Sequence, residues 1–145
     1  MNNDKLFEID FSYKIHPKDI IKLKDYLIKK QGWVYIAYSK NNHLFKIGRT
    51  GKNPLFRAKT LSSSGVLHDY EILFSLKFFN QFIAEKNIHQ TLKKYRINKE
   101  FFAVSEDLAI QTLDKEYQKE IKLLNRFFDT KMVEEDIELL DYALK

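Results

Sequence analysis

Residues 32–65 read GWVYIAYSKNNHLFKIGRTGKNPLFRAKTLSSSG, and this stretch decides the fold. Residues 33–38 are rich in β-branched and aromatic side chains, which is typical of a strand. Residues 39–42, Ser-Lys-Asn-Asn, predict a turn, and residues 44–47 predict a second strand that returns beside the first. The first half of the stretch is therefore interpreted as a short β-hairpin.

The second half of the stretch predicts a helix. Asn53 is a favourable N-cap, and Pro54 fits the first helical position because its missing N–H would be unpaired there in any case. Residues 62–65, Ser-Ser-Ser-Gly, end the pattern with a glycine. The helix would carry Arg57, so that tyrosine, lysine and arginine side chains gather at one end of a small sheet.

The flanking segments extend this pattern on both sides. Apolar and polar residues alternate over residues 7–15, which predicts a strand, and Pro17 opens an amphipathic helix that ends before Gly32. After the hairpin the sequence predicts a strand over residues 70–78, a helix over 81–95, a short strand over 101–104, and two acidic amphipathic helices over roughly 106–127 and 131–144. Phe82, Ile88, Leu92 and Tyr95 are the expected apolar anchors of the helix over 81–95.

This order predicts an α+β fold, with a small, largely antiparallel sheet of three strands flanked by helices. We expect an N-terminal strand-helix extension at residues 1–31, a central domain at residues 32–104, and an acidic helical tail at residues 105–145 that packs on that domain. The length of 145 residues is enough to bury a core.

Composition and charge narrow the class of function. The chain contains no cysteine, which excludes disulfides and thiol catalysis, and neither a secretory leader nor a membrane-spanning run is visible, so we expect a cytoplasmic protein. Residues 32–104 hold 12 Lys/Arg against 4 Asp/Glu, whereas residues 105–145 hold 6 against 11. A basic central domain suits a polyanion such as nucleic acid, although lysine-rich surfaces also occur without such a partner.

The ordered motifs resemble the GIY-YIG nuclease superfamily, in particular its phage-derived branch. The resemblance rests on Val34-Tyr35-Ile36, on Lys46-Ile47-Gly48 followed by Thr50, on the segment PLFRAKTLS at residues 54–62, on Glu85-x-x-x-His89, and on Glu100-Phe101-Phe102. It covers about residues 32–104. It implies a small GIY-YIG-like sheet and a metal-dependent endonuclease that hydrolyses DNA, with Mg²⁺ or Mn²⁺ as cofactor and DNA as partner.

The chemistry of phosphodiester hydrolysis fits these residue types. Glu85 offers the hard oxygen ligand that Mg²⁺ prefers, and Arg57 would donate two hydrogen bonds to the scissile phosphate. Tyr35 is the candidate general base, helped by the charge of Lys46. His89 lies one helical turn from Glu85 and would orient the phosphate or relay a proton. The candidate catalytic residues are thus Tyr35, Lys46, Arg57, Glu85 and His89, and the candidate DNA contacts are Arg49, Lys52, Lys59, Lys93, Lys94 and Arg96.

Other interpretations remain open for the same residues. Glu85 and His89 at this spacing also form ordinary surface pairs, Glu100 can cap or pair locally, and Arg57 can be a solvated charge. A second hypothesis for the whole domain is a DNA-binding module that does not cut and serves a regulatory or phage-defence role. A third is an interaction protein acting through the acidic tail, and a homodimer is possible for any of the three.

Overall fold

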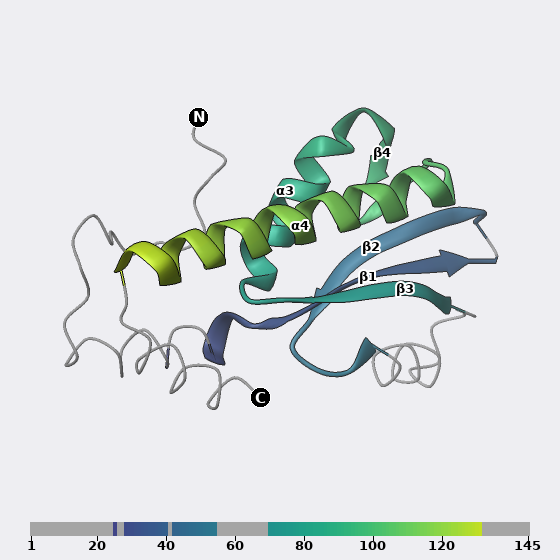
Figure 1. Cartoon of the computed structure of the whole chain (residues 1–145). Coiled ribbons are helices and arrows are strands. Elements are labelled where there is room, and N and C mark those ends of the chain that lie inside the picture. Colours follow the sequence, from purple (N-terminus) through teal and green to yellow (C-terminus); the bar gives the residue numbers. More distant parts are fainter. Residues whose placement is uncertain (1–24, 26–27, 41, 55–69, 132–145) are drawn as a thin grey trace.

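The computed structural model describes residue 25 and residues 28–40, 42–54 and 70–131 (Figure 1). The predicted strand over residues 7–15, most of the helix that follows it, and the last predicted helix over 131–144 lie outside the described residues. The predicted helix after Asn53 also lies outside them beyond Pro54, and with it Arg57 and Lys59.

Three strands form the main part of an antiparallel sheet. Strand β1 (Gly32–Ser39) is central, and β2 (Leu44–Thr50) and β3 (Tyr70–Phe78) pair with it on either side. The predicted hairpin is confirmed, since the turn between β1 and β2 is closed by a 2.9 Å hydrogen bond from the His43 N–H to the Ser39 carbonyl. His43 has φ 54°, in the left-handed region.

Two further strands lengthen the predicted three-stranded sheet, and one of them falls within the short strand predicted over residues 101–104. Strand β5 (Phe101–Phe102) pairs with β2, and β4 (Arg96–Asn98) pairs with β5, which gives the order β3-β1-β2-β5-β4. The predicted α+β class is confirmed. Strand β4 escaped prediction because three residues are too few to show a period of two, and the turn beside it depends on Lys99 at φ 45°.

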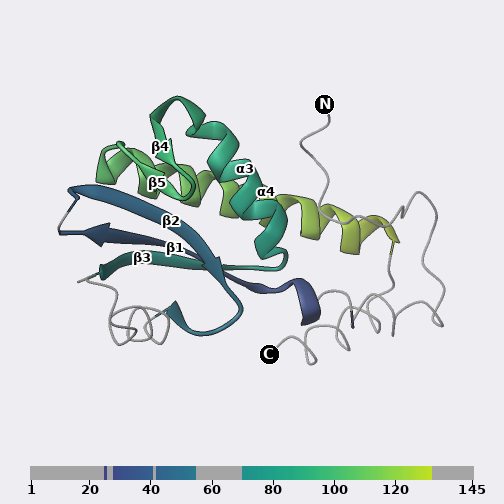
Figure 2. The same ribbon diagram turned by 180° about the vertical axis from the view of Figure 1, so that it is seen from behind.

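Both helices lie on the same face of the sheet (Figures 1 and 2). Helix α3 (Gln81–Thr91) is capped by the Asn80 side chain and ends four residues earlier than predicted, where a 3₁₀ turn (Lys93–Tyr95) follows. Helix α4 (Glu106–Lys131) starts after Ser105, whose hydroxyl accepts a hydrogen bond from the Leu108 N–H. The described helix thus continues past residue 127, where the sequence predicted an end.

The core lies between this helical layer and the sheet. Val34, Ile36 and Ile47 face the helices and pack with Ile88 and Leu113. The predicted anchor Ile88 is confirmed, whereas Phe82 keeps 39 % of its surface exposed and is not a core residue. Within the described residues no helix has the length and apolarity needed to cross a bilayer. The opposite face of the sheet carries Tyr35, which alternates with its core neighbours along β1.

Candidate active site at the outer edge of strand β2

Polar backbone groups on the edge of β2 that faces away from β1 bind Glu85, His89 and Glu100. Beyond its pairing with β5, the strand has polar backbone groups that need other partners. The Ile47 N–H donates to the Glu100 carbonyl at 2.9 Å, and the Ile47 carbonyl accepts from His89 Nε2 at 2.8 Å. The Arg49 N–H donates to the Glu85 carboxylate. Glu85, His89 and Glu100 are therefore fixed side by side on one strand edge.

The spacing of Glu85 and His89 matches the repeat of the strand that they complete. Four residues along a helix rise about 6 Å, and two residues along a strand advance about 6.8 Å. His89 meets Ile47 while Glu85 meets Arg49, so helix α3 runs antiparallel to β2. This geometry explains why a carboxylate and an imidazole four residues apart on the helix serve backbone groups two residues apart on the strand.

Tyr35 reaches toward this edge because Gly48 has no side chain. The two residues are cross-strand neighbours in the β1–β2 pair. A Cβ atom on Gly48 would lie 2.8 Å from the Tyr35 hydroxyl oxygen and 3.4 Å from Glu100 Oε2. The phenol therefore lies across Gly48, with its hydroxyl near the Glu100 carboxylate, and only 1 % of Tyr35 is exposed.

Lys46 and Glu100 form an ion pair next to the phenol. Lys46 Nζ lies 3.4 Å from Glu100 Oε2, and Lys46 is largely buried. Lys46 was expected near Tyr35, and the shared neighbour of both is Glu100. Glu100 was absent from the predicted catalytic set because its motif reads equally well as a local cap. The available signal was its place directly before Phe101-Phe102, in a motif that also carries the family resemblance.

The surroundings of Glu85 raise the pKa of its carboxyl. Burial raises the pKa of its carboxyl, and the nearby Glu100 raises it further, while His89, the Arg49 side chain and the Arg49 N–H oppose this rise. Arg49 Nε lies 3.8 Å from Glu85 Oε1. The other carboxylate oxygen, Oε2, is buried without a hydrogen-bond partner. Oε1 of Glu85 is thus paired with Arg49, whereas the buried Oε2 has no hydrogen-bond partner.

Arg49 is held from a second side by an exposed aromatic ring. Its guanidinium carbon lies 4.1 Å from the centroid of the Phe82 ring, and Lys30 Nζ lies 4.9 Å from the same centroid. A guanidinium on an aromatic face is stabilised by the ring's quadrupole. The exposure of Phe82 therefore has a reason: it is a platform for cations beside Glu85.

The predicted DNA contacts divide into separate groups. Arg49 joins the cluster, and Lys52 follows β2, where its N–H donates to Thr50 Oγ1 at 3.2 Å. Lys93, Lys94 and Arg96 lie at the end of the helical segment and on β4, where Lys94 covers the Tyr95 ring and Arg96 donates to the Lys99 carbonyl. Arg57 and Lys59 lie outside the described residues.

The donor set fits a hard divalent cation held by few protein ligands. Within the described residues no group of three or more His, Cys, Asp or Glu side chains is placed to hold a metal. Mg²⁺ commonly takes one or two carboxylates and completes its shell with waters and substrate phosphates. The unpartnered Glu85 Oε2 is a ligand of that kind, and Glu85 is the residue that would hold such an ion.

Carboxylates, cations and a tyrosine on the edge of a small α+β sheet define a module suited to phosphodiesters, and the family comparison agrees. The T5orf172 domain model matches residues 32–116, more than half of the chain, so the protein belongs to the T5orf172 domain family. Membership indicates a phage-type module of the DNA-binding or nuclease-like kind. The match extends into helix α4.

A viral protein shares part of the sequence. "Uncharacterized protein 460R" of Invertebrate iridescent virus 6 is 40% identical over 60 residues, which is 41% of this chain and 27% of that protein. The matched stretch thus spans about a quarter of the relative's own length. No solved structure matches the chain.

The expected membership of the GIY-YIG superfamily was wrong, because the family model that matches is that of the T5orf172 domain. Two residues that depart from the usual GIY-YIG pattern have structural roles here. Gly32 serves packing, since a Cβ there would lie 2.4 Å from the Gln81 amide nitrogen. Lys46 stands where that superfamily's second motif begins, and here its ammonium pairs with Glu100. Short motifs of common strand residues did not discriminate between the two families.

Proposed function

We propose that this protein hydrolyses phosphodiester bonds of DNA with Mg²⁺ or Mn²⁺ held at Glu85. The observation that supports the proposal most directly is the buried Glu85 Oε2, which has no hydrogen-bond partner among cationic and polar neighbours. Leaving a buried polar atom unpaired costs about 1–3 kcal/mol, and more when it is charged. A divalent cation would offset that cost and keep Glu85 ionised despite the burial that raises its pKa.

A cation at Glu85 would supply charge neutralisation for the phosphoryl oxygens and assistance to the leaving oxygen. The protein's own groups do the rest. Arg49 donates to a phosphate oxygen from its place on the Phe82 ring. Arg57, predicted to bind the scissile phosphate, has the same task in the proposal. Both guanidiniums stay charged at any physiological pH.

Proton transfer is assigned to Tyr35 and His89. The Tyr35 hydroxyl lies near Glu100, so Tyr35 would pass its own proton to that carboxylate and take one from the attacking water. Lys46 would stabilise the negative charge that the phenol oxygen carries between the two transfers. His89 donates from Nε2 to the Ile47 carbonyl, which leaves Nδ1 as its acceptor when the ring is neutral. In that tautomer Nδ1 would first take up a proton from solvent, and the imidazolium would then donate this proton from Nδ1 to the leaving oxygen.

A second candidate is a module that binds DNA without cutting it. It is favoured by the Arg49–Glu85 pair, in which the carboxylate holds the guanidinium on Phe82 and so prepares it for a phosphate. In that case Glu85 acts through Arg49 and needs no metal. A regulatory or phage-defence role would then follow from binding alone.

One experiment separates these functions. Supercoiled, linear and single-stranded DNA are incubated with the full chain in Mg²⁺, Mn²⁺ or EDTA, beside Glu85→Gln, Arg57→Ala and the exposed control Glu71→Gln. Metal-dependent nicking that is lost in the first two variants and kept in the control supports the nuclease. Retardation of DNA by the wild type without cleavage in any metal contradicts it and favours the binding module.

A further inference from the structure

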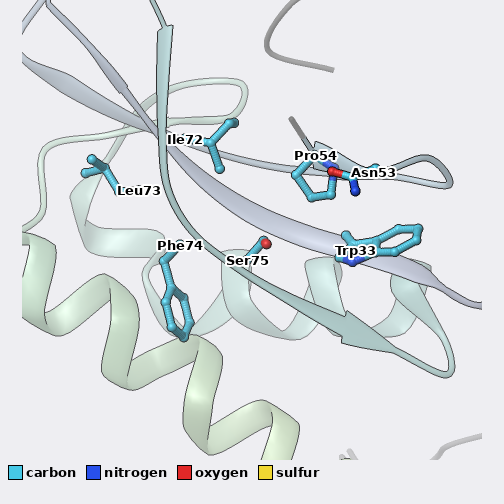
Figure 3. Close-up of a pocket in the computed structure, with 7 residues that line it drawn as sticks. All are labelled: Trp33, Asn53, Pro54, Ile72, Leu73, Phe74 and Ser75. Atoms are coloured by element: carbon cyan, nitrogen blue, oxygen red, sulfur yellow. The ribbon is translucent and has the colours of Figure 1, made fainter. Parts of the chain in front are cut away.

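A pocket on the sheet face opposite the helices is not used by the proposed mechanism. It has a volume of about 390 Å³ and is lined by Trp33 of β1, by Ile72 and Ser75 of β3, and by Asn53 and Pro54 after β2 (Figure 3). Figure 3 shows Ile72 and Ser75 on the side of the sheet that carries Asn53 and Pro54, whereas Phe74 points toward the helices.

An irregularity in β3 shapes this pocket. The register with β1 shifts so that Ile36 faces Phe74 while Ala37 faces Ile72, which leaves Leu73 as an extra residue. In a regular strand, residues three apart lie on opposite faces. The bulge brings Ile72 and Ser75 to the same face, and bulges of this kind often re-aim side chains beside functional sites.

The lining suits a flat heterocycle better than a charged ligand. The indole of Trp33 and the ring of Pro54 offer apolar surfaces, and none of the described lining residues carries a charge. The Ser75 hydroxyl and the Asn53 amide are groups that both donate and accept hydrogen bonds, as the edge of a nucleobase requires. Lys77, the cross-strand partner of Trp33, places its ammonium 5.0 Å from the indole centroid. The Lys77 ammonium could therefore pair with the phosphate of the nucleotide whose base stacks on Trp33.

The pocket adjoins the proposed catalytic cluster. Ser75 is the cross-strand partner of Tyr35, which has Gly48 as its partner on the other side. Cross-strand neighbours lie about 5 Å apart, and Trp33, two residues along the same strand, lies about 7 Å from Tyr35. A nucleotide whose base fills the pocket would therefore have its backbone close to the Tyr35 hydroxyl.

We propose that this pocket receives an unpaired DNA base next to the phosphate on which the Tyr35 cluster acts. The inference rests on the proposed function for the identity of the polymer, and it adds that the preferred substrate has an unstacked nucleotide. A base inside a duplex must be unpaired and unstacked before it can enter such a pocket, which is least costly where it has no partner. Bulged and single-stranded sites are therefore selected over fully paired DNA.

Trp33 is the single tryptophan of the chain, so its fluorescence reports on the pocket. Three duplexes of equal length are titrated in Ca²⁺: fully paired, with one bulged adenine, and with a bulged abasic nucleotide that keeps the backbone. We expect the bulged adenine to quench Trp33 and to bind about tenfold more tightly than the abasic bulge, since stacking of a base on an aromatic ring is worth about that factor. The paired duplex should leave the fluorescence unchanged.

Variants test whether the preference originates in the pocket. Because Trp33→Leu lacks the fluorophore, binding of the variants is followed by the fluorescence anisotropy of dye-labelled DNA. Trp33→Leu and Ser75→Ala should bring the ratio of the affinities for the adenine and abasic bulges close to one, with circular dichroism used to verify folding. Ile97→Ala removes an exposed apolar side chain on β4, away from the pocket, and should leave that ratio unchanged. Equal quenching by the adenine and abasic bulges in the wild type overturns the proposal without any variant, as does a Trp33→Leu protein that keeps the preference.

The outcome is independent of cleavage. If no DNA is cut in Mg²⁺ but Trp33 still distinguishes the two bulges, the base pocket stands and the nuclease does not. If paired and bulged DNA are cut at equal rates with no fluorescence difference, the nuclease stands and the pocket proposal fails.

Discussion

Glu120 on helix α4 allows a quantitative prediction of how the free energy of unfolding changes with pH. Its carboxylate accepts hydrogen bonds from the Phe79 N–H at 2.7 Å and the Asn80 N–H at 3.3 Å, and it is 5 % exposed. Burial raises its pKa from 4.5 to about 7, and Glu116 adds to the rise, while the two N–H bonds oppose it. The residue joins α4 to the corner between β3 and α3.

The sign follows from comparing the folded and unfolded states. Because the folded state keeps the Glu120 proton up to about pH 7 and the unfolded state loses it near 4.5, protonation favours folding between these values. The contribution is full below pH 4.5 and is lost as the pH rises through 7. At about 1.4 kcal/mol per pH unit, the free energy of unfolding should fall by about 2–3 kcal/mol between pH 5 and pH 8 from this group.

The assay is urea unfolding at pH 5, 6, 7 and 8, followed by far-UV circular dichroism, for wild type, Glu120→Gln and the exposed control Glu71→Gln. Glutamine cannot ionise and loses one of the two acceptors, so Glu120→Gln should have a constant cost and lack this slope. Its stability relative to wild type should improve by about 2–3 kcal/mol from pH 5 to pH 8. Parallel pH profiles would refute the reasoning. A wild type that gains on the variant as pH rises would show that the two N–H bonds outweigh burial.

Three further predictions concern the cluster and the cap of α3. Gly48→Ala should destabilise the fold by about 1–3 kcal/mol in urea unfolding and abolish any cleavage, because its Cβ would collide with the buried Tyr35 phenol; unchanged stability contradicts the close approach. Arg49→Ala should weaken DNA binding and reduce the slope of log K against log salt by about one, whereas an unchanged slope removes Arg49 from the interface. Asn80→Ala should cost about 1 kcal/mol of unfolding free energy, since the Asn80 side chain accepts the N–H groups of Phe82 and Ile83 at 3.1 Å, and a melting temperature equal to wild type counts against that cap.

The sequence predicted the hairpin because local signals agreed there. β-rich residues, a polar turn and a second β-rich run all indicate the same structure, whereas the register in which Tyr35 faces Gly48 is known from the structure alone. The third strand over Tyr70–Phe78 was also predicted correctly. The edge strand β4 was harder, because its pairing with β5 makes it a strand, and that is a tertiary effect.

The composition of the candidate site was only partly visible in the sequence. Glu85 and His89 were chosen for their helical spacing, but nothing in that spacing revealed that both complete the backbone of β2. Phe82 was assigned to the core because it is apolar, yet two cations cover its ring at the surface. Glu100 needed the three-dimensional structure, because only folding places it beside both Lys46 and Gly48.

Gly48 connects the strand geometry to the proposed chemistry. A side chain at this position would separate Tyr35, on the central strand, from the carboxylates at the outer edge of β2. Without one, the phenol reaches across a whole strand, so Tyr35 has Glu100 near its hydroxyl and Ser75 of the pocket on its other side. In the two proposals together, Tyr35 lies between the pocket that binds the DNA base and the cluster that acts on the phosphate. A change at Gly48 should then disturb catalysis while leaving the fluorescence response of Trp33 to an unpaired base in place, because Gly48 is not among the residues that line the pocket.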